Sequence, residues 1–536
     1  MPDMLDHPNH HSQRLSLNTK LLLFLILFSL FSVLFNLGGR SLENKDYLRY
    51  AEIAREILEL DDWVMLHENG NIYVHKPPLH FWKIAGAYKL FGVSPFAARL
   101  PAAIAAFCGA LIAFFFGKRL FRSPEIGFLA ALMLLSAYGY FWWARRTRID
   151  MEYAVLFSLS LILFYGGCET TDRKFKVLWY LAFWLATGFA FMDKAFIAFS
   201  NLMVVVPYGM MCVLKSEKQK LAPGLLAVTS IALLAPVLPW ILSMLNHPQF
   251  ADYWQILTKT KIMQRRMGLF FYLHQFPLKF FPASPFFFMG LWAYLKYRRQ
   301  LTQSHELAFI LLWTGAILFT LHWSPQKNHR YLLPIFLPAS MISAWAVWFF
   351  YRKNALVFNR LFLWSDRIVL VIASLSLISP FIVAGHYGLS WVDPLPLVLC
   401  LVLALILARI FLPLKLGAIF VSFVILFHVI EVNDTVLDEK RAVYLRMAKI
   451  ISAQGLAPAE IAFHGKSTRT QEGVSYYLNR LMGYSNNWKK LVKDSNIKGI
   501  VTTRKKAQKI IRWKKGESGV HIVPLDGELI LIVKRN

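Results

Sequence analysis

The stretch "KLLLFLILFSLFSVLFNL", Lys20 to Leu37, decides the fold class of this chain. Its apolar run is longer than the ~7–15 residues of a secretory signal, and no small-residue cleavage site follows it. It approaches the ~20 apolar residues that a bilayer-spanning helix needs. We therefore interpret it as a retained first membrane span, at the start of an α-helical protein that crosses the membrane many times.

Apolar runs of the same kind recur along the 536 residues, of which 57% are hydrophobic and only 17% are charged. The mean hydropathy of +0.45 is well above that of a soluble globular chain. We expect about thirteen spans, at residues 20–38, 97–116, 125–143, 151–168, 177–193, 195–214, 222–245, 280–297, 306–323, 331–351, 367–386, 393–411 and 414–431.

The formal net charge of +28 comes mostly from Lys and Arg clusters between apolar runs, which is the pattern of orientation signals. We therefore expect no nucleic-acid partner. Because every second connection carries such a cluster, the side that these connections share with the amino terminus is predicted to be cytoplasmic. The four cysteines lie in or beside apolar runs, so the sequence supports neither a disulfide framework nor a zinc motif.

Three regions follow from this pattern. Residues 1–19 form a cytoplasmic N-terminus, residues 20–431 a transmembrane domain with a large outer loop at 39–96, and residues 432–536 a small extracytoplasmic α/β domain. In the last region, "IAFHGK" and "IKGIVTT" are typical of strands, and "GVSYYLNRLMG" of a helix that ends at Gly483. Asp526-Gly527 between two apolar runs predicts a hairpin.

The outer loop begins with "KDYLRYAEIAREILEL", Lys45 to Leu60, an amphipathic helix with Asp46 and Arg49 on one face. Its apolar stripe suits the membrane surface. Further along, two prolines that follow Lys76 hold it and His75 in a rigid, non-helical segment. By pattern alone, this loop fits an interfacial helix without catalysis as well as a platform over an active site.

Three outer connections break the rule that this side is poor in Lys and Arg. Their charged residues are Arg145, Arg146, Arg148 and Asp150 in the first, Lys259, Lys261, Arg265 and Arg266 in the second, and Lys327, His329 and Arg330 in the third. Such clusters predict a site for phosphorylated substrates, with lipid headgroups as the alternative ligand. Asp193-Lys194, within an apolar run, indicates either a functional site or a water-exposed turn between two spans.

Several of these segments resemble one family of membrane enzymes, in the same order along the chain. They are "DYLRYAEIAREIL", "KPPL", "AARLPAA", the Arg148 to Met151 segment, "LATGFAFMDK" and "RYLLPIFLP". The chain is similar to the polytopic glycosyltransferases that use polyprenyl-phosphate sugars, best known from the 4-amino-4-deoxy-L-arabinose transferases of lipid A. Protein O-mannosyltransferases are more distant relatives. The likeness is strongest over about residues 40–200 and patchy to about 340.

The resemblance implies a GT-C-like architecture, a polyprenyl-phosphate sugar donor, inversion at the anomeric carbon, and an acceptor such as lipid A. The reaction would take place at the outer face of a bacterial inner membrane. The resemblance assigns catalysis to Asp46 and Asp150, and it implies that Lys194 contacts the donor phosphate. With the charge pattern, it points to substrate-binding roles for Arg49, His75, Lys76, Arg145, Arg148, Lys194, Arg265, Lys327 and Tyr331.

The chain departs from the family where metal binding is concerned. The family usually has Glu at the position of His75, commonly has Asp-Glu at the position of Asp46-Tyr47, and often has a His in the region of "TKIMQRRMG", which contains none. His75 is a candidate ligand of a divalent metal such as zinc, but it has no identifiable partners. We expect a metal to be dispensable, and we assign no cofactor.

Two other functions stay open on the sequence. In the first, the acceptor is a protein or another glycan, as for the O-mannosyltransferases. In the second, the chain is a flippase or transporter for an anionic lipid. Transporters often have paired broken helices in matching halves, and the sequence has no such internal symmetry. An enzyme embedded among membrane lipids, with a lipid-linked donor, fits the outer loop and the polar tail better.

Overall fold

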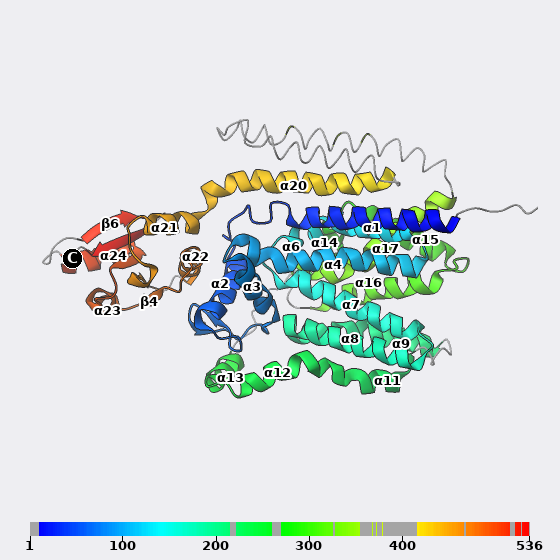
Figure 1. Ribbon diagram of the computed structural model, residues 1–536, viewed down its shortest axis with the longest axis horizontal. Helices are drawn as coiled ribbons and strands as arrows, with labels where there is room; N and C mark the ends of the chain where they lie inside the picture. Colours follow the sequence, from blue (N-terminus) through cyan, green and yellow to red (C-terminus); the bar gives the residue numbers. More distant parts are fainter. Residues whose placement is uncertain are drawn as a thin grey trace, which may run out of the picture.

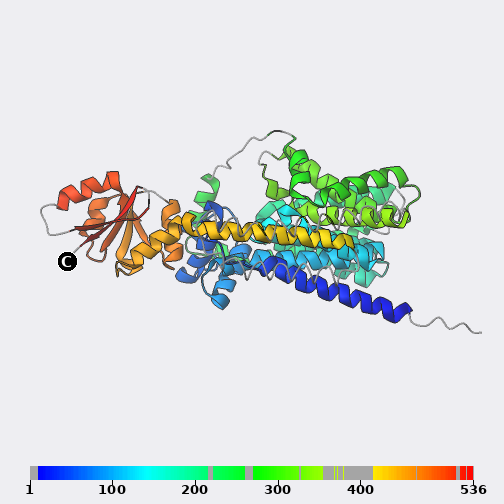
Figure 2. The same cartoon turned by 90° about the horizontal axis from the view of Figure 1, so that it is seen from above.

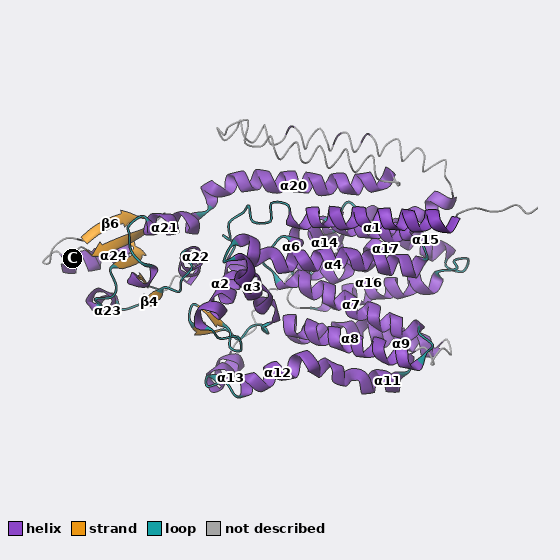
Figure 3. Cartoon of the chain, viewed as in Figure 1, coloured by secondary structure: helices purple, strands orange, loops and turns teal. Residues whose placement is uncertain are grey.

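The computed structural model describes residues 10–214, 221–259, 268, 270–324, 327–353, 367, 371, 378, 415–465, 468–514, 520–526 and 528–534. Its main body is a bundle of long helices that run side by side (Figure 1). In the described part of the chain, strands form only a two-stranded hairpin and a five-stranded sheet. Figure 3 shows how small the strand content is beside the helices.

Among the described residues, six helical segments have the length and hydropathy to cross a membrane. They are α4 (Pro95–Phe121), α7 (Ile149–Glu169), Arg173–Leu214, Pro223–Leu245, α16 (Ser304–Trp323) and His329–Arg352. A bent pair, α5 (Pro124–Ser136) and α6 (Tyr138–Ala144), turns through 68° and adds a seventh candidate. The chain is a multi-pass membrane protein, as the sequence predicts.

The longer segments are built from several helices, and further helices complete the bundle and its outer connections. These elements are α8 (Arg173–Lys194), η1 (Ala195–Asn201), α9 (Leu202–Leu214), α11 (Pro223–Val228), η2 (Thr229–Leu233), α12 (Leu234–Leu245), α13 (Phe250–Lys259), α14 (Phe271–Lys279), η3 (His329–Leu332) and α17 (Leu333–Lys353). The first helix, α1 (His10–Leu34), packs against α4 and α5.

The segment Arg173–Leu214 reverses its direction within its length. Asn201 Nδ2 donates a hydrogen bond to Thr187 Oγ1, fourteen residues earlier, at 2.9 Å. In one straight helix these residues would lie ~21 Å apart, since the rise is ~1.5 Å per residue. The chain reverses at Ala195, which has a positive φ of 58°. The reversal agrees with the two spans expected at 177–193 and 195–214.

The total number of crossings stays a prediction. Two expected spans, 367–386 and 393–411, fall almost entirely on residues outside those described. Others correspond to helices whose apolar part is short: Asn18–Leu34 within α1, α15 (Ser284–Tyr297), and Ile419–Val432 within α20 (Lys415–Arg441). Hydropathy locates these helices, but their length alone does not decide whether each one crosses the bilayer.

The outer loop forms a platform of α2 (Lys45–Leu60), β1 (His67–Glu68), β2 (Asn71–Ile72) and α3 (Leu79–Phe91), with an apolar core of its own. Asn44 caps α2, because its side chain accepts the Asp46 N–H at 3.1 Å. The carboxylate of Glu56 accepts the N–H groups of Asn69 and Gly70, at 2.6 and 2.8 Å. These bonds hold the hairpin turn against α2.

Helix α20 leads from the bundle to a small α/β domain at one end of the molecule (Figure 2). Its elements are α21 (Val443–Ser452), η4 (Pro458–Glu460), β3 (Ile461–His464), α22 (Thr468–Tyr477), β4 (Gly483–Ser485), α23 (Trp488–Lys493), β5 (Gly499–Thr503), α24 (Arg504–Lys514), β6 (Val520–Pro524) and β7 (Leu529–Lys534). The sheet order is β4-β3-β5-β7-β6; β3 is parallel to β4 and β5, and β7 is antiparallel to β5 and β6. Phe463 and Val501 face one apolar core, and Ala462 and Ile500 face a second, so the sheet is covered on both faces.

The strands β3 and β5 and the β6–β7 hairpin confirm three local predictions. The predicted helix end at Gly483 is wrong, because α22 already ends at Tyr477 and Gly483 begins β4. Asn479, with a φ of 52°, takes the left-handed conformation after the helix. Asn tolerates this conformation better than most residues, so the helix ends before Gly483 is reached.

Candidate functional site

A buried carboxylate, Asp150, is the centre of the site. It lies in the first turn of α7 and is only 2% exposed. Three cations surround it: Lys194 Nζ at 2.7 Å, Arg330 Nε at 3.1 Å and Arg148 Nε at 3.5 Å. Lys194 is the last residue of α8, and Arg330 lies in η3. Segments that are far apart in the sequence therefore meet at one acid.

The ends of two helices help to stabilise these buried charges. Asp150 is at the N-terminal end of α7 and Lys194 at the C-terminal end of α8, so each faces the favourable end of a helix dipole. Lys194 Nζ also lies 4.7 Å from the ring centroids of both Tyr153 and Tyr331. These cation–π contacts add to the stability of the buried ammonium group.

Asp193, the neighbour of Lys194, belongs to a second buried ionic network. Its two carboxylate oxygens accept from Lys83 Nζ at 2.9 and 3.1 Å. Lys83 also pairs with Glu152, whose other oxygen is 3.0 Å from His80 Nδ1. The network joins α3 to α7 and α8 through residues that are close in sequence to the Asp150–Lys194 pair. The Asp193-Lys194 dipeptide is therefore not a water-exposed turn, since both side chains are buried.

Arg148 connects the two acids of the site. Its Nη1 lies 2.6 Å from Asp46 Oδ2, and its guanidinium carbon lies 5.3 Å from the ring centroid of Tyr50. Burial by itself would raise the pKa of Asp46, but the nearby guanidinium groups of Arg148, Arg49 and Arg330 together outweigh it and hold that pKa below its ordinary value. Asp46 is therefore an ionised carboxylate at neutral pH.

Lys76 brings a further positive charge close to this cluster. Burial, followed by repulsion from Lys194, lowers the pKa of Lys76 to about 8. Arg330 and Arg148 act on Lys76 in the same direction. The site thus holds more positive charge than its two acids balance, and a phosphate group bound among these cations would relieve the repulsion.

Two cavities flank the cluster. The first, of about 240 Å³, has mainly apolar walls that include Ile197, Ile317 and Leu321, with Asp150 and Lys194 among the polar groups. The second, of about 350 Å³, is lined by aromatic and charged side chains, namely Asp46, Tyr47, Tyr138, Trp142, Trp143, Arg148, Lys279 and His329. Arg330 lines both cavities. The ion cluster therefore separates an apolar chamber from a polar, aromatic one.

The structure brings together most of the residues that the sequence singles out. Asp46, Lys76, Asp150, Arg148, Lys194 and Tyr331 all lie in or beside the cluster. Arg49 is more distant: its Nη1 is 3.9 Å from Asp46 Oδ1, and its Nε binds Glu68 Oε1 at 2.8 Å. Lys327 Nζ donates to the carbonyl oxygen of Gly268 at 3.1 Å, outside the cluster. Arg265 falls outside the described residues.

The prediction of a substrate-binding role for Arg145 does not agree with its position. Its Nε pairs with Glu431 Oε2 at 2.5 Å, and its Nη2 donates to the carbonyl oxygen of Phe35 at 2.5 Å. It also donates to the carbonyl oxygens of Ser32 and Val33 near the end of α1. All of its donor nitrogens are thus used to join α1 to α20. Arg145 is a structural residue, and Arg148, three positions later, is the arginine of this connection that lies in the site.

Sequence reasoning missed two residues of the site, Tyr153 and Lys279, and it placed Arg330 in a predicted phosphate-binding cluster without assigning it a role of its own. Arg330 is part of the quoted "RYLLPIFLP" segment, but the prediction favoured its neighbours Lys327 and Tyr331. Tyr153 lies one helical turn after Asp150, a spacing that places the two on the same face of α7. Lys279 is the last residue of α14, and apart from its charge nothing in the sequence marks it as a site residue.

Metal binding is not supported by a ligand cluster in the described part of the chain, which contains no group of three or more His, Cys, Asp or Glu side chains that could hold an ion. His75 lies at the surface, with its ring edge-to-face on Tyr73 at 5.2 Å. The acids Asp46 and Asp150 contact cations instead. The dispensability of a metal stays a prediction.

Comparison with known families agrees with this geometry. Residues 75–240 match the family of dolichyl-phosphate-mannose-protein mannosyltransferases. The chain is 28% identical over 330 residues to the undecaprenyl phosphate-alpha-4-amino-4-deoxy-L-arabinose arabinosyl transferase 2 of Proteus mirabilis, and 30% identical over 327 residues to the corresponding transferase of Aeromonas hydrophila. These alignments cover 60% and 59% of this chain, and 58% of each relative.

Solved structures extend the likeness in fold to nearly the whole chain. The crystal structure of ArnT from Cupriavidus metallidurans in the apo state matches with a TM-score of 0.74 at 21% identity, over 96% of this chain and 98% of that one. The same protein bound to undecaprenyl phosphate matches with a TM-score of 0.74 at 20% identity, over 95% and 97%. In sequence over about three-fifths of its length, and in fold over nearly all of it, the chain is similar to membrane-embedded transferases of the aminoarabinose class, as its motifs predict.

Proposed function

We propose that this protein transfers a sugar from a polyprenyl-phosphate donor to lipid A at the outer face of a bacterial inner membrane, with an aminoarabinose-type sugar as the group transferred. The observation that carries the proposal is the cluster of Asp150, Lys194, Arg148 and Arg330 between an apolar and a polar cavity. The similar proteins named as undecaprenyl phosphate-aminoarabinose transferases supply the class of donor.

The apolar cavity suits the donor. A polyprenyl chain fits walls such as Ile317 and Leu321, and its phosphate would then lie against Lys194 and Arg330. When the bond between the anomeric carbon and the phosphate oxygen breaks, negative charge grows on the leaving phosphate. Preorganised cations stabilise such charge, and removing one group of this kind typically costs ~10²–10³ in rate. Asp150 holds these cations in place.

The polar cavity suits the acceptor headgroup. Aromatic side chains such as Trp142 and Trp143 provide flat apolar faces for sugar rings, and Lys279 and Arg148 provide donors for a phosphate. An acceptor in this cavity and a donor in the other would approach from opposite sides of the cluster. This arrangement favours in-line attack on the anomeric carbon and therefore inversion.

The role of Asp46 depends on the acceptor group. A lipid A phosphate is largely ionised near neutral pH, since the second pKa of a phosphate monoester is ~6. It needs no base, and Asp46 would then orient it through Arg148 or stabilise positive charge on the sugar. If the acceptor is a hydroxyl, the carboxylate of Asp46 is placed to accept its proton. We propose that neither case requires a metal, because Arg148, Lys194 and Arg330 already supply positive charge.

The proposal includes an orientation in the membrane, which the positions of the basic clusters support. Lys118 and Arg119 lie at the end of α4, and Arg173 and Lys174 at the start of α8, which is the end of that helix opposite to Lys194. Basic clusters mark the cytoplasmic side. The N-terminus is then cytoplasmic, and the site, the outer loop and the C-terminal domain are periplasmic.

The proposal is tested with purified protein in proteoliposomes that contain lipid A and undecaprenyl-phosphate aminoarabinose. Mass spectrometry should find lipid A that is heavier by one aminopentose, and chelator should leave the rate unchanged. Transfer of a sugar to protein or another glycan, with no change in lipid A, would favour the O-mannosyltransferase type. Lipid movement without transfer would identify a flippase, and loss of activity in chelator that one added metal restores would show a metal requirement.

Substitution of Lys279 tests whether the polar cavity binds the acceptor rather than the donor. Its Nζ lies 4.9 Å from the Tyr138 ring centroid at the wall of the polar cavity. Lys279→Ala should raise the KM for lipid A about tenfold or more, since a hydrogen bond to a charged group contributes ~1.5–3 kcal/mol, and should leave the donor KM unchanged. Lys296→Ala is the matched control, because Lys296 also lies over an aromatic ring, at 4.8 Å from Trp292, but not at this cavity. A selective rise in donor KM would contradict the assignment.

A further inference from the structure

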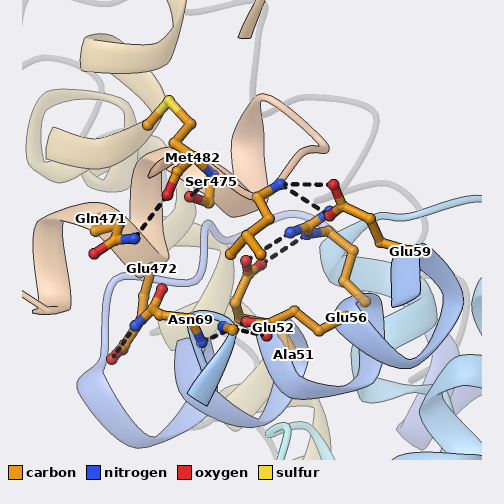
Figure 4. A network of polar contacts seen from close by, with 12 residues as sticks. Ala51, Glu52, Glu56, Glu59, Asn69, Gln471, Glu472, Ser475 and Met482 are labelled. Atoms are coloured by element: carbon orange, nitrogen blue, oxygen red, sulfur yellow. Dashed lines mark hydrogen bonds and ion pairs between the residues drawn. The ribbon is translucent and has the colours of Figure 1, made fainter. Parts of the chain in front are cut away.

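The C-terminal domain is held against the outer-loop platform by α22 and the turn that follows it. The hydroxyl of Tyr477 accepts the Leu42 N–H at 2.7 Å, and the carboxylate oxygens of Glu59 accept the Leu481 N–H at 2.9 and 3.1 Å. Tyr476, which is 3% exposed, is part of the apolar core of the platform. Figure 4 shows the polar contacts between this part of the domain and α2. The rest of the domain is therefore held in a defined position relative to the transfer site.

Helices α23 and α24 belong to the far part of this domain, and α22 lies between them and the platform (Figure 1 and Figure 2). Between residues 488 and 515 the sequence has eleven Lys and Arg residues and one acid, Asp494. Six of these cations are exposed on the two helices, and among the described residues none of the six forms an ion pair with an acid. They are Lys489, Lys490, Lys493, Arg504, Lys505 and Lys506.

The fold gathers these cations on one side of the sheet and near one of its edges. Leu491 of α23 and Ala507 of α24 are buried in the same apolar core, so the two helices cover the same face. Strands β4 and β5 are both parallel to β3, so their carboxyl ends lie along one edge. Helix α24 follows β5 directly, and α23 follows β4 after two residues. Ligands of open α/β sheets commonly bind outside the carboxyl ends of parallel strands.

Lys506 extends this positive charge over the end of β3. Its ammonium group occupies the space that a side chain at position 465 would need, and Gly465, with a φ of 101°, leaves that space open. Arg504, Lys505 and Lys506 form the first turn of α24, which contains no acid. Positive charge is unfavourable in the first turn of a helix. These three cations therefore do not stabilise their own helix, and an anionic ligand explains their position.

We propose that this basic surface of α23 and α24 binds a phosphorylated sugar chain carried by the acceptor lipid. The proposal rests on the proposed function and extends it, because it gives the C-terminal domain a role in recognising the acceptor beyond lipid A. Sugars attached to lipid A project out of the membrane, on the side where the domain lies. Lys and Arg side chains are the usual partners of phosphate groups.

An anionic bilayer fits the same surface less well. The two helices lie in the part of the domain that is farthest from the membrane-spanning bundle (Figure 1). Helices that bind at a membrane surface insert an apolar face into it. In α23 and α24 the apolar residues Leu491, Val492, Ala507 and Ile510 are buried in the domain core instead. The observations therefore favour a soluble, phosphate-bearing glycan over a lipid surface.

The test measures binding without transfer. The full-length protein in nanodiscs is titrated with the phosphorylated core oligosaccharide of lipopolysaccharide, released from its lipid. Lys490→Gln/Lys505→Gln removes one charge from each helix and keeps residues that favour helix formation. Its affinity should be about tenfold or more below that of wild type, because each Lys or Arg that meets an anionic surface adds to the binding free energy. Binding to wild type should weaken as the ionic strength rises.

Lys449→Gln/Lys498→Gln is the matched control, since it removes two exposed charges from the same domain. Lys449 lies on α21, which packs against the other face of the sheet, and Lys498 already pairs with Glu460 at 2.6 Å. The control should bind the oligosaccharide as wild type does. In transfer assays, Lys490→Gln/Lys505→Gln should raise the KM for lipopolysaccharide by the same factor as it lowers the affinity, and should leave the KM for lipid A alone unchanged.

Equal affinity of wild type and Lys490→Gln/Lys505→Gln for the oligosaccharide would overturn the proposal. Equal affinity of the wild-type protein for the oligosaccharide before and after its phosphates are removed would also overturn it. A loss of binding to phosphatidylglycerol vesicles, with no loss of oligosaccharide binding, would assign the surface to a membrane instead. If none of these proteins transfers sugar, the proposed function fails, and the titration still decides whether the surface binds the glycan.

Discussion

Replacing Asp150 with asparagine should reduce kcat by about a thousandfold while the protein still inserts and folds. The carboxylate contacts Lys194, Arg330 and Arg148 at 2.7, 3.1 and 3.5 Å. Asn has nearly the same shape but no charge, so the three cations would repel one another at a buried position. Losing the charge that holds these preorganised cations in place removes stabilisation of the transition state, and the loss of one such electrostatic group typically costs ~10²–10³ in rate.

Initial rates of the purified variant, at several concentrations of donor, measure this loss. Asp526→Asn is the matched control, because Asp526 forms an ion pair with Arg446 at 2.5 Å but is partly exposed and lies in the C-terminal domain. The control should keep nearly full activity. Turnover of Asp150→Asn at the wild-type rate would remove this carboxylate from the catalytic machinery. Asp46→Asn should also abolish transfer if Asp46 acts as base or orients the acceptor.

The overall fold was accessible from the sequence because hydropathy marks membrane helices directly. The places where the sequence was insufficient are the ends of helices. The 68° bend between α5 and α6 occurs at Ala137, and the reversal after α8 occurs at Ala195. Neither residue is a turn former by type. These breaks are imposed by tertiary contacts, such as the bond from Asn201 to Thr187, which pattern reasoning does not capture.

The same limit explains which site residues were predicted. The acids and Lys194 could be placed because a charge in an apolar run needs a partner. The choice between Arg145 and Arg148 could not be made, since both lie in the non-helical connection between α6 and α7, where side-chain direction has no fixed period. Arg330, in a 3₁₀ turn, was passed over for its neighbours for the same reason. The partner of Arg145, Glu431, lies 286 residues away, and no local pattern connects the two.

Replacing Lys194 separates donor binding from acceptor binding and is the second large effect that we expect. Its ammonium group projects into the apolar cavity between Tyr153 and Tyr331, at 4.7 Å from each ring centroid, and pairs with Asp150 at 2.7 Å. If Lys194 contacts the donor phosphate, Lys194→Ala removes a positive charge that stabilises both the bound donor and the transition state. The donor KM should rise about tenfold or more, kcat should fall by ~10²–10³, and the acceptor KM should stay within about twofold of its wild-type value.

Lys194→Arg keeps the charge but presents it as a planar fork rather than a point, and it should recover only part of the activity. Lys174→Ala, an exposed position in the first turn of the same helix, is the control for α8 and should behave as wild type. Steady-state kinetics with each substrate varied in turn give the two KM values. Equal increases in the donor KM and the acceptor KM would mean that Lys194 has only a structural role in holding α7 against α8. The phosphate would then have to be bound by Arg330 and Lys76.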